Sequence, residues 1–488
     1  MRKFLLLVGA AIMSINSYGA GNKVETLGDG TVYSFEKLSQ NDTTGVVKVN
    51  GGYAVIKDIT IAEGDHFELD DNVTIKMADK VNVRVNGTVK MDLMQGTTVT
   101  RMAEADMPKG FSISASNTET ITCCNLSMEY AALRFTVNTT VHVTDCSFKY
   151  ANGKLTSSGA LVLGGDNPMF IIEHCEFISN QVPGIGGGAN IPCGVLIKNC
   201  VFEDNNTKNM NRPQVNLTVG GNQSVEVVNN TFVGAKREKV GAVAVSNMLG
   251  IQGTNKVRIE GNDARYHRFG ITTNGMMEAV IKNNVLVENK YEPNPMNGGS
   301  GISVYDTNQN QTVYIEGNTI TGHLWGITLI GCKSANIGKT GNPNAADYNP
   351  GNNIFKDNGN GGKLYDLYNN GPNTVYAQGN TWNVDEQTAE KIETVISHKA
   401  DNPSLGEVIF MPAGTGGVDA IEAERLFFDR AAKQILGLGD VDMVQVYSVS
   451  GLMTGDVLVE DGVANMSNLP SGVYVVKTGD GKAMKIQL

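Results

Sequence analysis

One short pattern recurs along most of this 488-residue chain. In each copy a short apolar strand is followed by Asn or Cys, then by any residue, then by an apolar residue. The copies are roughly 22 to 35 residues apart, which is the range of structural repeats that stack in one dimension. The Asn or Cys positions are Cys124, Cys146, Cys175, Cys200, Asn230, Asn262, Asn284, Asn318, Asn353 and Asn380. This in-phase repetition predicts a solenoid.

A second sequence element keeps step with the first. It is a short strand that begins with Gly and falls between successive Asn or Cys positions, as at Gly159, Gly241, Gly270, Gly301 and Gly326. Each repeat therefore carries at least two short strands, and the alternation within them directs Ile, Val, Leu and Phe inward. This pattern is typical of a parallel β-helix, in which each strand bonds to the equivalent strands of the neighbouring coils, about 4.8 Å away.

The recurring Asn or Cys has a physical role at the bend between strands. An inward Asn amide can bond to the backbone of the next coil and to the next Asn, which leaves no buried polar group unpaired. Cys fills the same bend as a small hydrophobic residue, and stacked Cβ atoms point in parallel, so core thiols are expected rather than disulfides. We therefore expect one internal column through these positions. Outward charges support the register, since Glu173 would meet Lys198 and Glu226 would meet Arg258 on neighbouring coils.

The arrangement resembles the right-handed parallel β-helix proteins, which include pectate-lyase-like enzymes and phage tailspikes. The resemblance covers roughly residues 45 to 410. Near its end, residues 388–399 place Ile392, Val395 and Ile396 on one helical face, which predicts a cap over the last coil. The expected fold is all-β, with a right-handed parallel β-helix and its caps over residues 21–410, followed by a small antiparallel β-sandwich.

The C-terminal part has a different period. Residues 411–419 have the composition of a linker, and residues 420–488 contain short strands with turn punctuation, which predicts the sandwich. Within it, the strings VYSVSG, NLPSGVYVVK and KIQL closely resemble the C-terminal sorting domain of the type IX secretion system. The resemblance implies secretion machinery as a partner, and release to, or attachment at, the outer surface of a diderm bacterium.

The N-terminus has the order of a secretory signal peptide, which we place over residues 1–20. Met1-Arg2-Lys3 precedes an apolar run and then a small and polar stretch that ends at Ala20. The apolar run is too short to cross the ~30 Å hydrocarbon layer, and no later segment is long enough, so no membrane span is expected. A net charge of -11 argues against a nucleic-acid partner. We expect a protein that is secreted or held on the outer cell surface.

The turns that follow the Asn positions are basic and aromatic. They lie at residues 236–239, 265–268, 290–291 and 323–325. Because cations pair with carboxylates or sulfates and aromatic rings stack on sugar faces, this stripe predicts glycan binding. The candidate substrate-binding residues are Arg237, Arg265, Arg268, His323 and Trp325. A lyase would also need a base, for which Lys239, Tyr266 and His267 are candidates.

Three functions stay open, because a fold by itself does not give a function. The first is a non-catalytic protein that binds a polysaccharide, in the manner of an adhesin. The second is a polysaccharide lyase or glycoside hydrolase that acts on an acidic glycan, and the third is a structural surface spacer. No Ser-His-Asp spacing, P-loop or metal-ligand spacing is present, so neither a metal nor another cofactor is expected.

Overall fold

The computed structural model describes residues 23–166, 168–187, 192–414, 426–430, 432–439, 441–448, 451–479 and 481–488. The predicted signal peptide and the larger part of the predicted linker lie outside the described residues. The chain divides into two compact units, residues 1–415 and residues 416–488.

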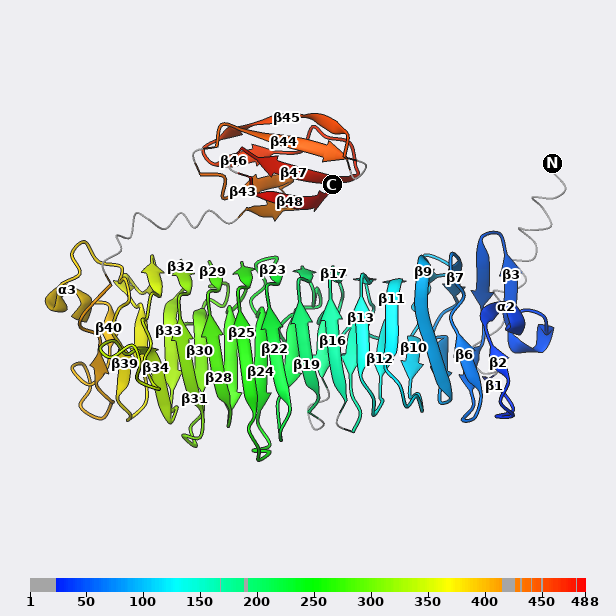
Figure 1. Cartoon of the computed structure of the whole chain (residues 1–488), viewed down its shortest axis with the longest axis horizontal. Helices are drawn as coiled ribbons and strands as arrows, with labels where there is room; N and C mark the ends of the chain where they lie inside the picture. Colours follow the sequence, from blue (N-terminus) through cyan, green and yellow to red (C-terminus); the bar gives the residue numbers. More distant parts are fainter. Residues whose placement is uncertain are drawn as a thin grey trace. The chain divides into compact units, whose positions relative to one another are not determined.

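The first unit is a parallel β-helix whose coils follow one another in chain order, from blue to yellow in Figure 1. One 14-stranded sheet, here called the first sheet, runs through it. Its strands, in order, are β1 (Lys23–Glu25), β5 (Asp58–Ile61), β8 (Asn82–Val85), β10 (Gly110–Ile113), β12 (Ala132–Phe135), β15 (Leu161–Leu163), β18 (Ile185–Gly187), β21 (Val215–Thr218), β24 (Val243–Asn247), β27 (Ile271–Gly275), β30 (Ser300–Tyr305), β33 (Trp325–Ile330), β38 (Leu367–Asn369) and β40 (Ile396–Ser397).

Each central coil contributes two more strands, so a coil has three strands, which agrees with the prediction of at least two. The second sheet contains β2 (Val32–Tyr33), β6 (His66–Glu68), β9 (Thr88–Arg101), β11 (Ile121–Glu129), β13 (Val141–Thr144), β16 (Met169–Glu173), β19 (Gly194–Lys198), β22 (Ser224–Val228), β25 (Lys256–Glu260), β28 (Glu278–Lys282), β31 (Thr312–Glu316), β34 (Ser334–Gly338), β39 (Val375–Ala377) and β41 (Val408–Ile409). The third contains β3 (Val46–Val49), β4 (Gly52–Val55), β7 (Thr74–Met77), the second halves of β9 and β11, β14 (Ser147–Lys149), β17 (Glu176–Ile178), β20 (Val201–Glu203), β23 (Thr231–Val233), β26 (Asp263–Arg265), β29 (Val285–Val287), β32 (Thr319–Thr321) and β35 (Ile354–Lys356).

The predicted internal column lies at the bend between the second and third sheets. Asn284 shows the bonding of one rung: its Nδ2 donates to Ile259 O at 3.0 Å and to Asn318 Oδ1 at 2.9 Å, and its Oδ1 accepts from the backbone N–H and the Nδ2 of Asn262. The same bonds join Asn230 to Asn380 through the intervening rungs. Every Asn of this first ladder is buried. The predicted column is confirmed from Cys146 onward.

Cys124 is a correction to the predicted column. It lies opposite Thr144 in the β11–β13 pair, and its Sγ contacts Asp92 Oδ1 at 3.0 Å. Leu126 takes the column position instead, because β11 pairs with β13 and β14 at one constant register that places Leu126, two residues after Cys124, opposite Cys146. The other column cysteines are buried free thiols, and Cys200 bridges to the first ladder through its N–H, which donates to Asn230 Oδ1 at 2.9 Å.

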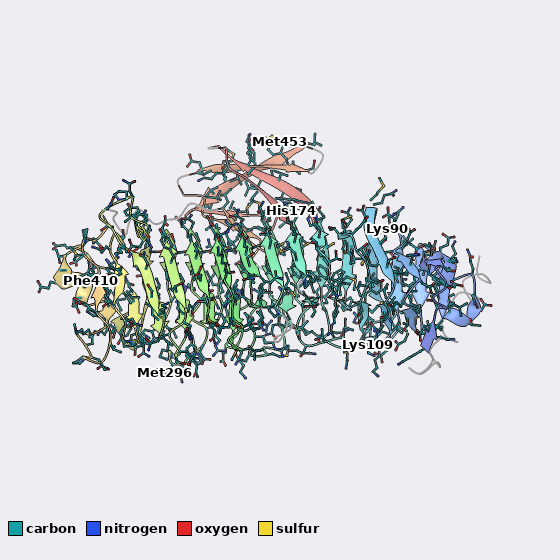
Figure 2. All side chains as sticks on the ribbon, turned by 60° about the horizontal axis from the view of Figure 1, so that its bottom comes forward. Lys90, Lys109, His174, Met296, Phe410 and Met453 are labelled. Carbon is teal, nitrogen blue, oxygen red and sulfur yellow. The ribbon has the colours of Figure 1, made fainter. Side chains whose placement is uncertain are left out.

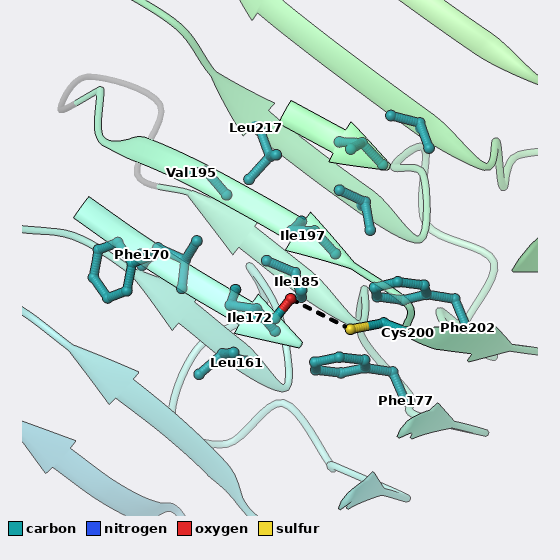
Figure 3. Close-up of a cluster of buried hydrophobic side chains, with 14 of the residues drawn as sticks. Leu161, Phe170, Ile172, Phe177, Ile185, Val195, Ile197, Cys200, Phe202 and Leu217 are labelled. Carbon is teal, nitrogen blue, oxygen red and sulfur yellow. Dashed lines mark hydrogen bonds between the residues drawn. The ribbon is translucent and has the colours of Figure 1, made fainter. Parts of the chain in front are cut away.

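Apolar side chains fill the space between the sheets. Phe148, Phe177, Phe202 and Phe232 occupy equivalent positions and stack with centroid separations of 5.0, 4.8 and 4.7 Å. Figure 3 shows two of these rings packed among branched aliphatic side chains beside the Cys200 thiol. On the outside, the predicted pairing of opposite charges is confirmed for Glu173–Lys198 at 3.9 Å and Glu226–Arg258 at 2.5 Å.

Both ends of the first unit are capped. The N-terminal cap carries helix α2 (Phe35–Leu38), which buries Phe35, and the 3₁₀ turn η1 (Asp42–Thr44). The C-terminal cap carries α3 (Ala389–Glu393), which begins with Thr388 as its N-cap and ends before the two last apolar positions of the predicted helix. Ile392, Val395 and Ile396 are all buried, as predicted, although Ile396 belongs to β40.

The second unit is a small antiparallel β-structure, and its prediction is also confirmed. Its strands, in sheet order, are β42 (Phe427–Asp429), β43 (Gln434–Leu436), β46 (Val463–Asn465), β45 (Met453–Glu460), β44 (Met443–Ser448), β47 (Val473–Thr478) and β48 (Ala483–Gln487). Its core is separate from that of the first unit and is formed by residues such as Ile435, Val446 and Val476.

Candidate functional site

The predicted stripe lies at the corner where the third sheet ends and the chain turns toward the first sheet. One residue per coil occupies the same outer position there, and in all of these coils but the last its backbone N–H donates to the equivalent strand end of the next coil. Its non-glycine members have φ between 47° and 67°, which turns the chain sharply. We call this set the corner column: Tyr130, Tyr150, Ser179, Asp204, Gly234, Tyr266, Glu288, Gly322 and Asp357.

The residue after each corner position is buried, except the exposed Ala235, and many of these buried residues form a second internal ladder, with Gln214 as the rung between Asn205 and His267. Its bonds run from each side-chain donor to the next acceptor, so that Asn180 Nδ2 donates to Asn205 Oδ1, Asn205 to Gln214, and onward. The order is Asn180, Asn205, Gln214, His267, Asn289, His323, Asn358 and Asp366. All are buried.

His267 and His323 are therefore corrections to the predicted stripe. Each side chain is 1% exposed and forms a rung of the second ladder, where Nδ1 donates to the following Asn Oδ1 and Nε2 accepts from the preceding amide. Burial lowers the pKa of both imidazoles to about 3. Neither ring meets a ligand on the surface, because backbone of the corner covers it, and both rings are neutral at ordinary pH.

The predicted arginines lie at the corner, but each is held by a carboxylate. Arg237 bonds to Asp204 Oδ1 at 3.0 and 2.7 Å, and Arg265 pairs with Asp263 at 2.7 Å. Arg268 lies 3.7 Å from Glu292 and donates to the side chain of Asn211 and the carbonyl of Asn297, which ties two loops together. These side chains are 12 to 28% exposed. Their charge is largely neutralised locally, which weakens the predicted recognition of acidic groups at these positions.

The two remaining catalytic candidates lie apart from any acid–base arrangement. Lys239 is exposed and lines an open depression of about 310 Å³ with Arg268 and Glu292. Tyr266 is half-buried, and the Nζ atom of Lys236 lies 5.4 Å from its ring centroid. His267 is buried and cannot form an acid–base pair at the surface. The three predicted catalytic residues therefore do not form one site.

Trp325 belongs to a cluster of three half-exposed rings near the N-terminal ends of strands β33 and β38 of the first sheet. Its ring centroid is 4.6 Å from that of Tyr365 and 5.2 Å from that of Tyr368, and its Nε1 donates to Pro295 O at 2.8 Å. Tyr368 lies beside Thr328 on the outer face of the sheet. The Nζ of Lys363, from the short hairpin β36 (Gly359–Asn360) and β37 (Lys363–Leu364), is 5.2 Å from the Tyr365 ring.

The loop that fixes Trp325 also reaches solvent. Pro295, whose carbonyl accepts the indole N–H, precedes Met296, whose side chain is 83% exposed and is labelled at the edge of the solenoid in Figure 2.

Tyr365 and Tyr368 were not predicted from the sequence. The Gly series at 270, 301 and 326 continues in register at Asp366, so one further coil would have predicted a strand there with Tyr368 facing outward.

Comparison with protein families agrees with the solenoid fold. Residues 156–342 match the family described as the right handed beta helix region. The solenoid is a right-handed parallel β-helix. A double mutant of the tailspike protein of E. coli bacteriophage HK620, in complex with a pentasaccharide, is similar over 90% of this chain and 86% of its own, with 11% identity and a TM-score of 0.34. Another mutant of that tailspike, also with a pentasaccharide, covers 98% and 87% with 11% identity and a TM-score of 0.26. No curated protein sequence matches the chain.

The described residues contain neither a candidate metal site nor a candidate membrane-spanning helix. No group of three or more His, Cys, Asp or Glu side chains in that part of the chain could hold a metal ion. No helix there is long and apolar enough to cross a membrane.

Proposed function

We propose that this protein is exported and binds a polysaccharide through the cluster formed by Trp325, Tyr365 and Tyr368. The observation that carries the proposal is the half-exposed state of all three rings. Trp and Tyr expose apolar ring faces while their polar atoms stay hydrogen-bonded, which suits stacking against the apolar face of a sugar. The indole is held in place through its N–H by Pro295, so little side-chain freedom is lost on binding.

The binding experiment compares Tyr368→Ala with Tyr376→Ala, both in the full-length chain. Tyr376 is also a half-buried ring of the solenoid, but it lies on β39 in the second sheet. Electrophoresis in gels that contain soluble polysaccharides should show retardation of the wild type, and Tyr368→Ala or Trp325→Ala should weaken it by at least about tenfold, as expected for an aromatic anchor. Tyr376→Ala should behave as wild type.

The same samples distinguish the other candidate functions. Unsaturated or reducing sugar products released from the retarding polysaccharide would favour a lyase or a hydrolase. Retardation without product favours the binding protein. If no polysaccharide retards the wild type, the proposed function is wrong and the surface spacer is favoured.

Export is part of the proposal and rests on the sequence of the two ends of the chain. We expect mass spectrometry of the mature protein to find the N-terminus directly after Gly19 or Ala20. Removal of residues 420–488 should shift the protein from the outer surface or medium to the periplasm, if this unit acts as a sorting domain. A truncated chain that still reaches the surface would show that the unit has another role.

A further inference from the structure

Three clusters along the corner combine stacked or adjacent rings with a cation. In the first, the Arg101 guanidinium lies 3.8 Å from the Tyr130 ring centroid, and the centroids of Tyr130 and Tyr150 are 5.2 Å apart. In the second, Lys236 Nζ lies 5.4 Å from the ring of Tyr266 and 5.7 Å from that of Tyr291. The third is the Trp325 cluster with Lys363. We call them the ring–cation clusters.

The ring–cation clusters follow one edge of the solenoid. Tyr130, Tyr150 and Tyr266 are members of the corner column, so they repeat the same position on different coils. Tyr150 and Tyr266 are four coils apart, which corresponds to about 19 Å at the spacing of neighbouring strands. Trp325 begins the first-sheet strand two coils beyond Tyr266, immediately after the same corner.

The cations of these clusters differ from the arginines of the predicted stripe. Within the described residues, Arg101, Lys236 and Lys363 form no ion pair, whereas Arg237, Arg265 and Arg268 each pair with a carboxylate. Lys236 and Lys363 are also exposed. An unpaired cation beside a ring face is stabilised by the ring but keeps its charge available to an anion.

We propose that the ring–cation clusters are subsites for one extended anionic polysaccharide, which lies along the corner parallel to the solenoid axis. Sugar faces stack on the tyrosine and tryptophan rings, and carboxylate or sulfate groups pair with Arg101, Lys236 and Lys363. This inference rests on the proposed function and adds to it the charge of the polymer and the direction in which it binds. Several weak subsites on one chain give an avidity that a single sugar does not reach.

The test uses the full-length protein with alginate, a polyuronate, and dextran, a neutral glucan, as probes. The variant carries Arg101→Gln, Lys236→Gln and Lys363→Gln together. A matched control carries Lys76→Gln, Lys256→Gln and Lys333→Gln, which removes the same charge at exposed positions that contact no described ring. We expect the first variant to bind alginate at least about tenfold more weakly at low salt, and the control to stay within about twofold of wild type.

A second variant tests the extent of the site. Tyr130→Ala with Tyr150→Ala removes the first cluster, which is remote from Trp325, and should weaken binding of long alginate chains while leaving short oligomers unaffected. Equal binding of alginate and dextran, or equal loss in the two triple variants, would overturn the anionic assignment while leaving the proposed function intact. If the tyrosine variant binds long chains as wild type does, the extended site is wrong. If Trp325→Ala binds every probe normally, the proposed function fails as well.

Discussion

Replacing Asn284 with Leu is expected to lower the free energy of unfolding by about 4 kcal/mol, because it interrupts the first ladder in a fully buried position. Leu keeps the volume of the side chain but accepts no bond from the Asn262 N–H and donates none to Ile259 O. A buried polar group that loses its partner costs roughly 1 to 3 kcal/mol, and at least two such groups are left.

Denaturant unfolding of the full-length chain measures this loss. The matched control is Asn216→Leu, on the outer face of β21, which should change stability by no more than about 0.5 kcal/mol. Because each coil contacts only its neighbours, amide hydrogen exchange should accelerate first in β25, β28 and β31. A loss below about 1 kcal/mol, or uniform exchange, would contradict a ladder that stabilises the coils.

Acidification from pH 6.5 to 4.5 is expected to remove about 3 kcal/mol of stability through three buried groups of the second ladder. The pKa values of His267 and His323 are lowered to about 3 by burial, so the stability due to their neutral rings is complete above about pH 6.5 and is lost as the unfolded chain takes up protons below it. Each imidazole contributes about 1.4 kcal/mol per pH unit.

Asp366, at the end of the same ladder, acts in the opposite direction. Burial raises its pKa to about 7, so its protonated form stabilises the fold below about pH 4, and this contribution is lost as the pH rises through 7. Between pH 4.5 and 6.5 two histidines oppose one aspartate, which leaves a net loss of about 1.4 kcal/mol per unit on acidification.

Unfolding at several pH values tests this balance through slopes rather than absolute stabilities. His323→Asn keeps a donor and an acceptor in the rung, as Asn289 does one coil earlier, and should bring the net slope close to zero. Asp366→Asn should steepen the slope to about 2.7 kcal/mol per unit. The surface variant Asn216→Leu, which removes no titratable group and lies outside both ladders, should keep the wild-type slope. Identical slopes in all four proteins would mean that the ladder histidines do not titrate as buried groups.

The first ladder could be predicted from the sequence because one residue type fills it over many coils. The second could not be found in the same way, because its members change from Asn to Gln to His. A positional regularity was nevertheless present, since Asn205, His267, Asn289 and His323 each lie five residues after a member of the internal column. That offset assigns the two histidines to the interior, whereas their basic and aromatic neighbours suggested a surface role.

The candidate site could be predicted only in part. Trp325 was identified from its place in a basic and aromatic turn, but its partners Tyr365 and Tyr368 follow a hairpin insertion that hides the next repeat. The arginines are neutralised by Asp204, Asp263 and Glu292. Asp263 lies two residues before Arg265 on β26, whereas Asp204 and Glu292 meet Arg237 and Arg268 only through the folded arrangement of the chain. Predicting the stack of Tyr130 on Tyr150 required the correct strand register of the first coils, and the sequence prediction misassigned that register at Cys124.

In both ladders the bonds between side chains run in one direction, toward the C-terminal cap, and the second ladder ends on the Asp366 carboxylate, which only accepts when ionised. Every interior rung therefore presents a hydrogen-bond acceptor to the preceding rung and a donor to the following rung. Whole coils could be duplicated or excised during evolution without leaving a mismatched amide, provided that an acceptor still terminates the series. The length of the corner column is thus free to change while the pairing of the interior amides is kept.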